Sequence, residues 1–195
     1  MRTAVIFLLM LLGIASNVQS QEAYDGCSNA LEICANETYS LNNLGSNVSS
    51  CANCEDDFTY CFTPDNSIWC VFTTNAAGGA VTIDFSNLVF EINPGQDNEL
   101  QATVIQALTP CVSNTYTQIG ACLSNETGNF TLNPGVLAPN TTYYLVIDGD
   151  NNGAGITSAA ECTFDLVISG AGIDRPISAA SISESTTNAC LNEIV

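Results

Sequence analysis

Acidic and amide side chains near residue 150 have the spacing of a calcium-binding loop. Asp148, Asp150 and Asn152 stand at alternate positions with a glycine after them, which matches the first half of a loop whose alternating oxygens surround the ion. The second half is missing, because Ala159 occupies the position of the bidentate glutamate and Glu161 comes two residues late. Asn, Asp and Gly also dominate ordinary hairpin loops. The pattern therefore predicts either a calcium site with the ligands Asp148, Asp150 and Asn152 or a plain loop.

The other neighbouring carboxylates do not form a pattern typical of catalysis. Glu55, Asp56 and Asp57 are consecutive, and adjacent residues of a strand point to opposite faces, so we interpret them as a solvated acidic loop rather than a catalytic pair. The chain contains no His and no Lys, which leaves no ordinary base to activate a serine or cysteine nucleophile. We therefore expect no enzymatic activity.

The first twenty residues have the features of a signal peptide. Arg2 precedes an apolar run over residues 4–15, and a small residue, Ser20, closes the segment. The run is about a dozen residues long, whereas a membrane-spanning helix needs roughly 20. We therefore expect a secreted chain that does not itself span a membrane.

The charge of the mature chain restricts its partners. After cleavage at residue 20 the only basic side chain is Arg175, and all 20 acidic residues remain, so the side-chain charge is 1 − 20 = −19. Such a surface repels phosphate backbones and anionic headgroups and attracts cations, calcium above all. We expect no nucleic-acid partner.

Ten cysteines follow the signal peptide and predict a disulfide-stapled domain. Cys51, Cys54 and Cys61 could instead form a zinc or redox centre, but an exported chain favours disulfides. The complete set is Cys27, Cys34, Cys51, Cys54, Cys61, Cys70, Cys111, Cys122, Cys162 and Cys190.

Short alternating segments predict an all-β, antiparallel β-sandwich of jelly-roll type. In 80–85 every second residue is apolar, which is typical of a half-buried strand. The segments 142–147 and 162–168 flank a loop rich in Gly, Asn and Asp, and they predict a hairpin in the core. The segment 100–108 fits a strand or a short helix. The remaining predicted strands are 67–74, 88–92, 116–122 and 130–132.

Three aromatic residues could form a platform for stacking a sugar. Alternation places Tyr143 and Tyr144 on opposite faces of their strand, so at least one of them belongs to the core. We interpret Trp69 as a core residue as well.

The composition changes after residue 170 and defines the expected domain organisation. The β-sandwich module spans 21–170, and a Ser/Thr-rich linker occupies 171–187. The final segment, 188–195, reads as the first strand of a following immunoglobulin-like or PKD-like domain that the chain does not complete.

Five segments, taken in order, resemble a known class of secreted module, and they are 25–34, 67–74, 110–122, 137–149 and 162–168. They are similar to the N-terminal β-sandwich modules of gliding-motility-associated surface proteins that bacteria export by type IX secretion. The last two also look like the bacterial pre-peptidase C-terminal domain.

The resemblance also bears on the cysteines. Cys70 stands where these modules carry an aromatic residue, so it reads as a buried free thiol, and Cys190 falls in the expected following domain. Eight cysteines then remain for four bridges. We expect Cys111 to pair with Cys122 across a hairpin, and the other pairings stay open.

The resemblance implies a non-enzymatic adhesion or structural module of a larger bacterial cell-surface protein. Its partner would be a surface polysaccharide, another protein or a neighbouring extracellular domain. The alternative is an accessory calcium- or carbohydrate-binding domain of a secreted hydrolase.

Overall fold

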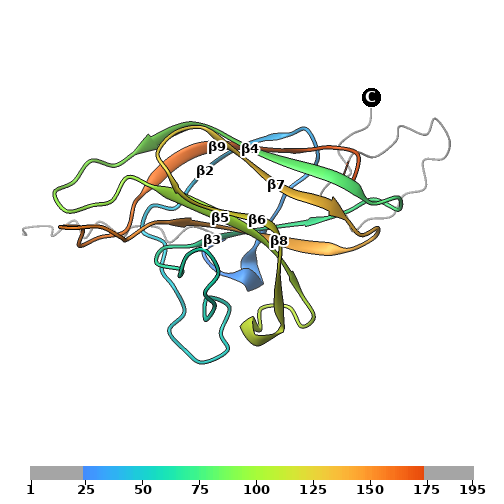
Figure 1. The fold of residues 1–195 in the computed structure, drawn as a ribbon, viewed down its shortest axis with the longest axis horizontal. Coiled ribbons are helices and arrows are strands. Elements are labelled where there is room, and N and C mark those ends of the chain that lie inside the picture. Colours follow the sequence, from blue (N-terminus) through green and yellow to red (C-terminus); the bar gives the residue numbers. More distant parts are fainter. Residues whose placement is uncertain (1–23, 174–195) are drawn as a thin grey trace, which may run out of the picture.

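The computed structural model describes residues 24–173, which form two β-sheets packed face to face (Figure 1). This confirms the predicted all-β sandwich. The strands are β1 (Leu31–Glu32), β2 (Thr38–Asn42), β3 (Ile68–Thr73), β4 (Gly79–Phe90), β5 (Leu100–Ala107), β6 (Tyr116–Glu126), β7 (Phe130–Leu137), β8 (Thr142–Gly149) and β9 (Cys162–Ser169). Two short 3-10 turns, η1 (Cys27–Asn29) and η2 (Ser113–Thr115), precede β1 and β6.

The strand order is that of a jelly roll. One sheet has the order β1-β3-β8-β5-β6 and the other β2-β9-β4-β7. With the two-residue β1 set aside and β2 counted as the first strand, the sheets read 2-7-4-5 and 1-8-3-6, the connectivity of two Greek keys. Only the short β1–β3 pair is parallel among the paired strands of the described residues.

Period-two alternation builds the core between the sheets, as the sequence predicts. Strand β9 buries every second residue from Cys162 to Ile168, and β4 does the same with Val81, Ile83 and Phe85. The facing sheet contributes Ile68, Cys70 and Phe72 of β3 and Tyr143, Leu145 and Ile147 of β8. Each of these strands therefore turns one apolar face toward the core between the sheets.

Two expectations about strand partners need correction. The segments 142–147 and 162–168 do not form a hairpin, because β8 pairs with β3 and β5 while β9 pairs with β2 and β4 in the other sheet. The predicted strand 88–92 is the end of β4, which continues through an irregularity between Ser86 and Val89. Alternation indicates which face of a strand is buried, but it does not indicate which strand lies beside it.

A second, smaller core lies on the outer face of the five-stranded sheet. The connection from β2 to β3, residues 43–67, is here called the flap, and Figure 1 shows it hanging below that sheet. Phe58 and Phe62 of the flap pack on Trp69, whose ring also lies 6.1 Å from that of Tyr144. Trp69 is thus a core residue, as predicted, and the burial of Tyr143 in the main core confirms that at least one of the two tyrosines belongs to the core.

Disulfides attach this layer to the sheet, but not by the expected pairing. Cys27 bonds to Cys111 and Cys61 bonds to Cys122, so the predicted Cys111–Cys122 bridge is wrong. The reason is the distance between the two cysteines. Cys111 lies in the β5–β6 turn, while Cys122 lies six residues along β6 from Tyr116. Six residues of strand span about 20 Å, whereas bridged Cα atoms lie within about 7 Å.

The remaining described cysteines fall into two groups. Cys51 bonds to Cys54 within the flap, and Cys34 is also disulfide-bonded. Cys70 and Cys162 are free and buried, which confirms the predicted free thiol at Cys70. The expectation of four bridges among the other eight cysteines is wrong, because Cys162 is one of these eight.

Some expectations concern residues outside the described part. The predicted signal peptide at 1–20, the linker beyond residue 173 and the segment 188–195 all lie there. Among residues 24–173 no helix is long and apolar enough to cross a membrane.

Candidate functional site at the loop end

Two loops meet at one end of the sandwich and bring the predicted loop near residue 150 together with a distant segment. The β4–β5 loop (91–99) and the β8–β9 loop (150–161) project at the same end in Figure 1. Backbone N–H groups of Asp97 and Thr157 donate across them to the carbonyls of Ser158 and Gly95, at 3.0 and 2.7 Å. We call this region the loop end.

Asp148, the first predicted calcium ligand, is an internal hydrogen-bond acceptor. Its side chain is fully buried, and its Oδ1 accepts from the backbone N–H groups of Asp65 and Asn66 and from the hydroxyl of Ser67, each at 2.9 Å. Oδ2 accepts from Nε2 of Gln101 at 2.8 Å. With four donors in place the carboxylate ties the flap to β8 and β5, so we remove Asp148 from the candidate calcium ligands.

Burial and hydrogen bonding act in opposite directions on this group. Burial raises the pKa of Asp148 to about 7, although the donors from Asp65, Gln101, Asn66 and Ser67 favour the charged form.

The packing of the backbone explains why the next residue, Gly149, is a glycine. A Cβ there would collide with the carbonyl oxygen of Ala160, so the absence of a side chain permits close packing of the two segments.

Asp150, the second predicted ligand, lies in a cluster of three carboxylates. One carboxylate oxygen each from Asp97, Glu99 and Asp150 lies within 4.8 Å of the others, and Asp97 and Asp150 are buried. The pKa of Glu99 is raised, first by burial and then by the negative charges of Asp97 and Asp150. We call these three residues the carboxylate triad.

Amide side chains surround the triad. Asn152, the third predicted ligand, donates its backbone N–H to Asp97 at 3.0 Å and its Nδ2 to Asp150 at 3.2 Å. In the amide orientation that satisfies its neighbours, Asn125 of β6 donates to Glu99 at 3.2 Å and to Asp150 at 3.3 Å. The triad is thus held by residues of three segments.

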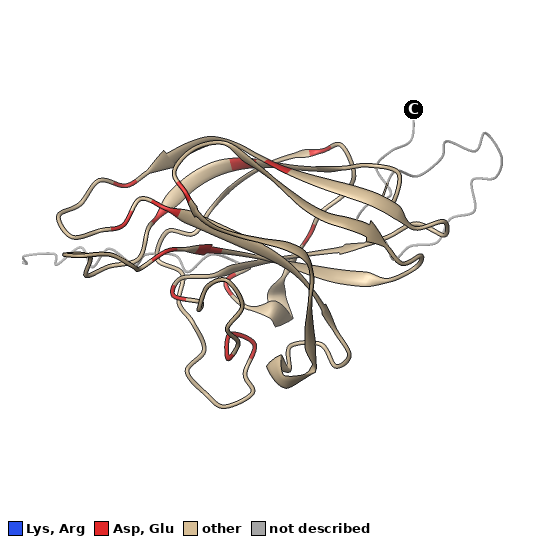
Figure 2. Ribbon diagram, in the orientation of Figure 1, with Lys and Arg blue, Asp and Glu red and all other residues tan. Residues whose placement is uncertain are grey.

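No basic side chain is available to neutralise the triad within the described residues. The two arginines of the chain, at positions 2 and 175, lie outside residues 24–173, and Figure 2 shows red segments but no blue ones. Three carboxylates this close repel one another, and sharing a proton or binding a cation would relieve that repulsion. Oxygen donors of this kind are what calcium prefers.

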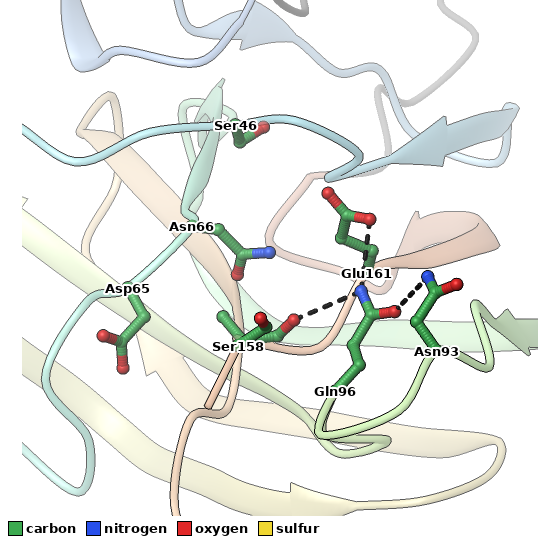
Figure 3. A pocket seen from close by; sticks show the side chains of 8 residues that line it. Ser46, Asp65, Asn66, Asn93, Gln96, Ser158 and Glu161 are labelled. Carbon is green, nitrogen blue, oxygen red and sulfur yellow. Dashed lines mark hydrogen bonds between the residues drawn. The ribbon is translucent and has the colours of Figure 1, made fainter. Parts of the chain in front are cut away.

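A polar pocket opens beside the triad. Its volume is about 360 Å³, and its side-chain lining comes from the flap and from both loops of the loop end. Figure 3 shows Asn93, Gln96 and Glu161 in a row on one side and Asn66 on the other. Nε2 of Gln96 donates to Glu161 at 3.1 Å, and Nδ2 of Asn93 donates to Gln96 at 2.7 Å.

Asp65 connects the pocket to the carboxylate triad. It lines the pocket, and its pKa is raised by burial and by the charge of Asp150 and lowered by a hydrogen bond from Asn151. The two features therefore belong to one region.

The carboxylates at 55–57 do not form a second site. Asp56 is a buried residue of the flap, and it accepts from the indole N–H of Trp69 at 3.2 Å and from the backbone N–H of Ser49 at 2.7 Å. Asp57 accepts from the backbone N–H of Asn53 at 2.7 Å. Burial raises the pKa of Asp56 to about 6. These residues are structural, although Asp56 is not the solvated residue that the sequence predicts.

Sequence reasoning misses two triad residues. Asp97 and Glu99 precede β5, about fifty residues before Asp150, and a contiguous motif cannot include them. The available signal is the acidic stretch 97–99 directly before an apolar strand, which points to a loop at a sheet end.

Comparison with known proteins adds no relative from which a function could be transferred. Models of protein families give no match to the chain, and neither do curated proteins.

Proposed function

We propose that the chain is a non-enzymatic extracellular adhesion or structural module of a larger bacterial surface protein, and that its loop end binds calcium. The support for secretion is the signal-peptide pattern together with the disulfides of the described residues. The support for a surface module is the order of segments that resembles gliding-motility-associated proteins.

The carboxylate triad carries the calcium part of the proposal. Its three side chains converge within 4.8 Å in a region that contains no basic residue, and amide groups of Asn125 and Asn152 approach from other segments. A calcium ion would relieve the repulsion among the carboxylates and join the two loops of the loop end. Calcium takes six to eight oxygen ligands, so waters or backbone carbonyls would complete the shell.

The absence of ordinary catalytic bases supports the non-enzymatic part. The sequence contains neither His nor Lys, and the carboxylates at 55–57 are engaged in separate hydrogen bonds. An accessory domain of a secreted hydrolase remains the alternative, because the polar pocket next to the triad would suit a carbohydrate-binding role equally well.

Calorimetric titration of the purified chain with calcium chloride tests the proposal. We expect one site per chain, with a dissociation constant in the range of about 0.1–1 mM typical of extracellular modules. Glu99→Gln should weaken binding by about tenfold or more, while Glu91→Gln, the same change on an exposed residue of the same loop, should not. Equal binding by the two variants would contradict the assignment of the site.

A further inference from the structure

We infer that the polar pocket at the loop end is a binding site for a neutral sugar ring. The inference deepens the proposed function, because it treats the pocket as the recognition site of a non-enzymatic module. The pocket brings side chains together from three parts of the chain: the flap, the β4–β5 loop and the β8–β9 loop. Such convergence of polar groups in a concavity is typical of small-molecule sites.

The chemistry of the lining selects the class of ligand. Apart from Ala159, every side chain of the lining is polar, so an apolar ligand would leave these groups without partners. Two of them, Asp65 and Glu161, are acidic and none is basic, which disfavours an anion. Amides both donate and accept, and so do sugar hydroxyl groups. A neutral polyhydroxyl ring therefore fits the lining.

The carboxylate of Glu161 is already engaged, which argues against a simple cation pocket. Its Oε1 accepts from the backbone N–H of Gly45 at 2.9 Å, and its Oε2 accepts from Gln96 at 3.1 Å. The charge thus serves to hold Gln96 and the flap in position. Figure 3 shows the resulting row of Glu161, Gln96 and Asn93, which presents hydrogen-bonding groups along one side of the pocket.

Ser46 provides an independent observation. It lines the pocket and is 8% exposed, and its hydroxyl has no hydrogen-bond partner. A buried hydroxyl without a partner is destabilising, and rotation about one side-chain bond would turn it toward a ligand. A sugar hydroxyl in the pocket would supply the missing partner.

The size of the pocket and the absence of aromatic lining limit the ligand further. A volume of about 360 Å³ lies at the lower end of the range of about 300–1,000 Å³ for small-molecule sites, so it suits one ring or the end of a chain. Because no aromatic side chain lines it, binding depends on hydrogen bonds alone. We therefore expect a dissociation constant in the millimolar range.

Amide chemical-shift mapping by NMR on the full chain tests the inference. The probes are the methyl glycosides of glucose, galactose and mannose, with N-acetylglucosamine as a fourth neutral sugar and glucuronate and putrescine as charged controls. At least one neutral sugar should shift resonances of residues 43–49, 65–66, 93–98 and 158–161. Glucuronate should bind more weakly than the matching neutral sugar.

Variants separate recognition from stability. Ser46→Ala should weaken sugar binding about three- to tenfold, the loss of one hydrogen bond, while leaving the melting temperature unchanged or raising it, because an unpartnered hydroxyl is removed. Asn93→Ala should weaken binding to a similar degree. Asn98→Ala is the matched control, an exposed asparagine of the same loop that does not line the pocket.

Three results would overturn the inference. They are the absence of pocket shifts with all four neutral sugars, binding of putrescine alone, and full binding by both Ser46→Ala and Asn93→Ala. Repeating the titration in calcium and in chelator separates the two proposals. Sugar shifts that persist in a chain shown to bind no calcium would uphold the pocket and refute the calcium site.

Discussion

Asp148 shows how a residue can match a ligand motif and serve another purpose. The motif places it first in a calcium loop, yet three of its four donors come from the flap and the fourth from β5. Asp148 serves as an internal acceptor, and Gly149 beside it allows the close approach to Ala160, whereas the glycine that completes the motif is Gly153.

Asp148→Asn should therefore destabilise the module strongly. The amide would direct a donor at groups that are themselves donors, and hydrogen bonds to a charged group are worth about 1.5–3 kcal/mol each. We expect a loss of about 2–4 kcal/mol in the free energy of unfolding, measured by urea denaturation. Asp57→Asn, on an exposed residue, is the control and should change it by less than about 1 kcal/mol. Similar effects of the two substitutions would rule out this role for Asp148.

Site residues that are far apart in the sequence cannot be grouped from the sequence alone, because only the fold brings them together. Asp150 was identified because it belongs to a contiguous motif, whereas Asp97 and Glu99 reach it only through the pairing of two loops. Ser46 and Asn93 carry no motif at all. Their importance comes from the pocket that three separate segments form.

At the scale of elements, the sequence predicts strands well and their neighbours poorly. The alternation in β4 and β9 identifies their buried faces. The predicted pairing of β8 with β9 is wrong, because consecutive strands most often pair but here the β8–β9 loop crosses between the sheets. The predicted Cys111–Cys122 bridge is wrong because each cysteine bonds to a segment distant in the sequence, Cys111 to η1 and Cys122 to the flap.

The bridge between Cys61 and Cys122 should hold the flap on its sheet. Replacing both with serine removes a cross-link that spans 61 residues, worth about 4 kcal/mol in the loop-entropy model. The chain has a single tryptophan, Trp69, which lies beneath the flap, so its fluorescence should shift to longer wavelength in this variant.

A matched control for this prediction lies within the flap itself. The Cys51–Cys54 bridge spans only three residues, and its removal should cost about 2 kcal/mol at most and leave the emission of Trp69 unchanged. If both double variants gave the same emission and stability, the Cys61–Cys122 bridge would not be what secures the flap.

At the scale of the whole molecule, two buried carboxyl groups predict an unusual response to pH. Asp56 and Asp148 have pKa values raised to about 6 and 7 in the folded state, against an ordinary value of 3.8. At a pH between the ordinary value and the raised value, each carboxyl group is ionised in the unfolded chain but still protonated in the folded chain. The free energy of unfolding should therefore fall as pH rises from about 4 to 7.

Thermal melting of the calcium-free chain between pH 5 and pH 8 measures this effect. The melting temperature should be higher at pH 5, and Asp56→Asn should flatten the part of the slope below pH 6, because that group no longer titrates. A melting temperature that rises steadily toward pH 8 would show that these carboxyls are ionised in the folded state throughout.

The central claim is that the loop end holds calcium, and thermal melting at pH 7.5 with calcium or chelator tests it most directly. With a dissociation constant of about 0.1 mM, 10 mM calcium stabilises the native state by about 2.7 kcal/mol. For a module of this size that corresponds to a rise of about 5–10 °C in melting temperature, which Glu99→Gln should abolish and Glu91→Gln should retain. An unchanged melting temperature for the unmodified chain, or an equal rise in the Glu99→Gln variant, would contradict the claim.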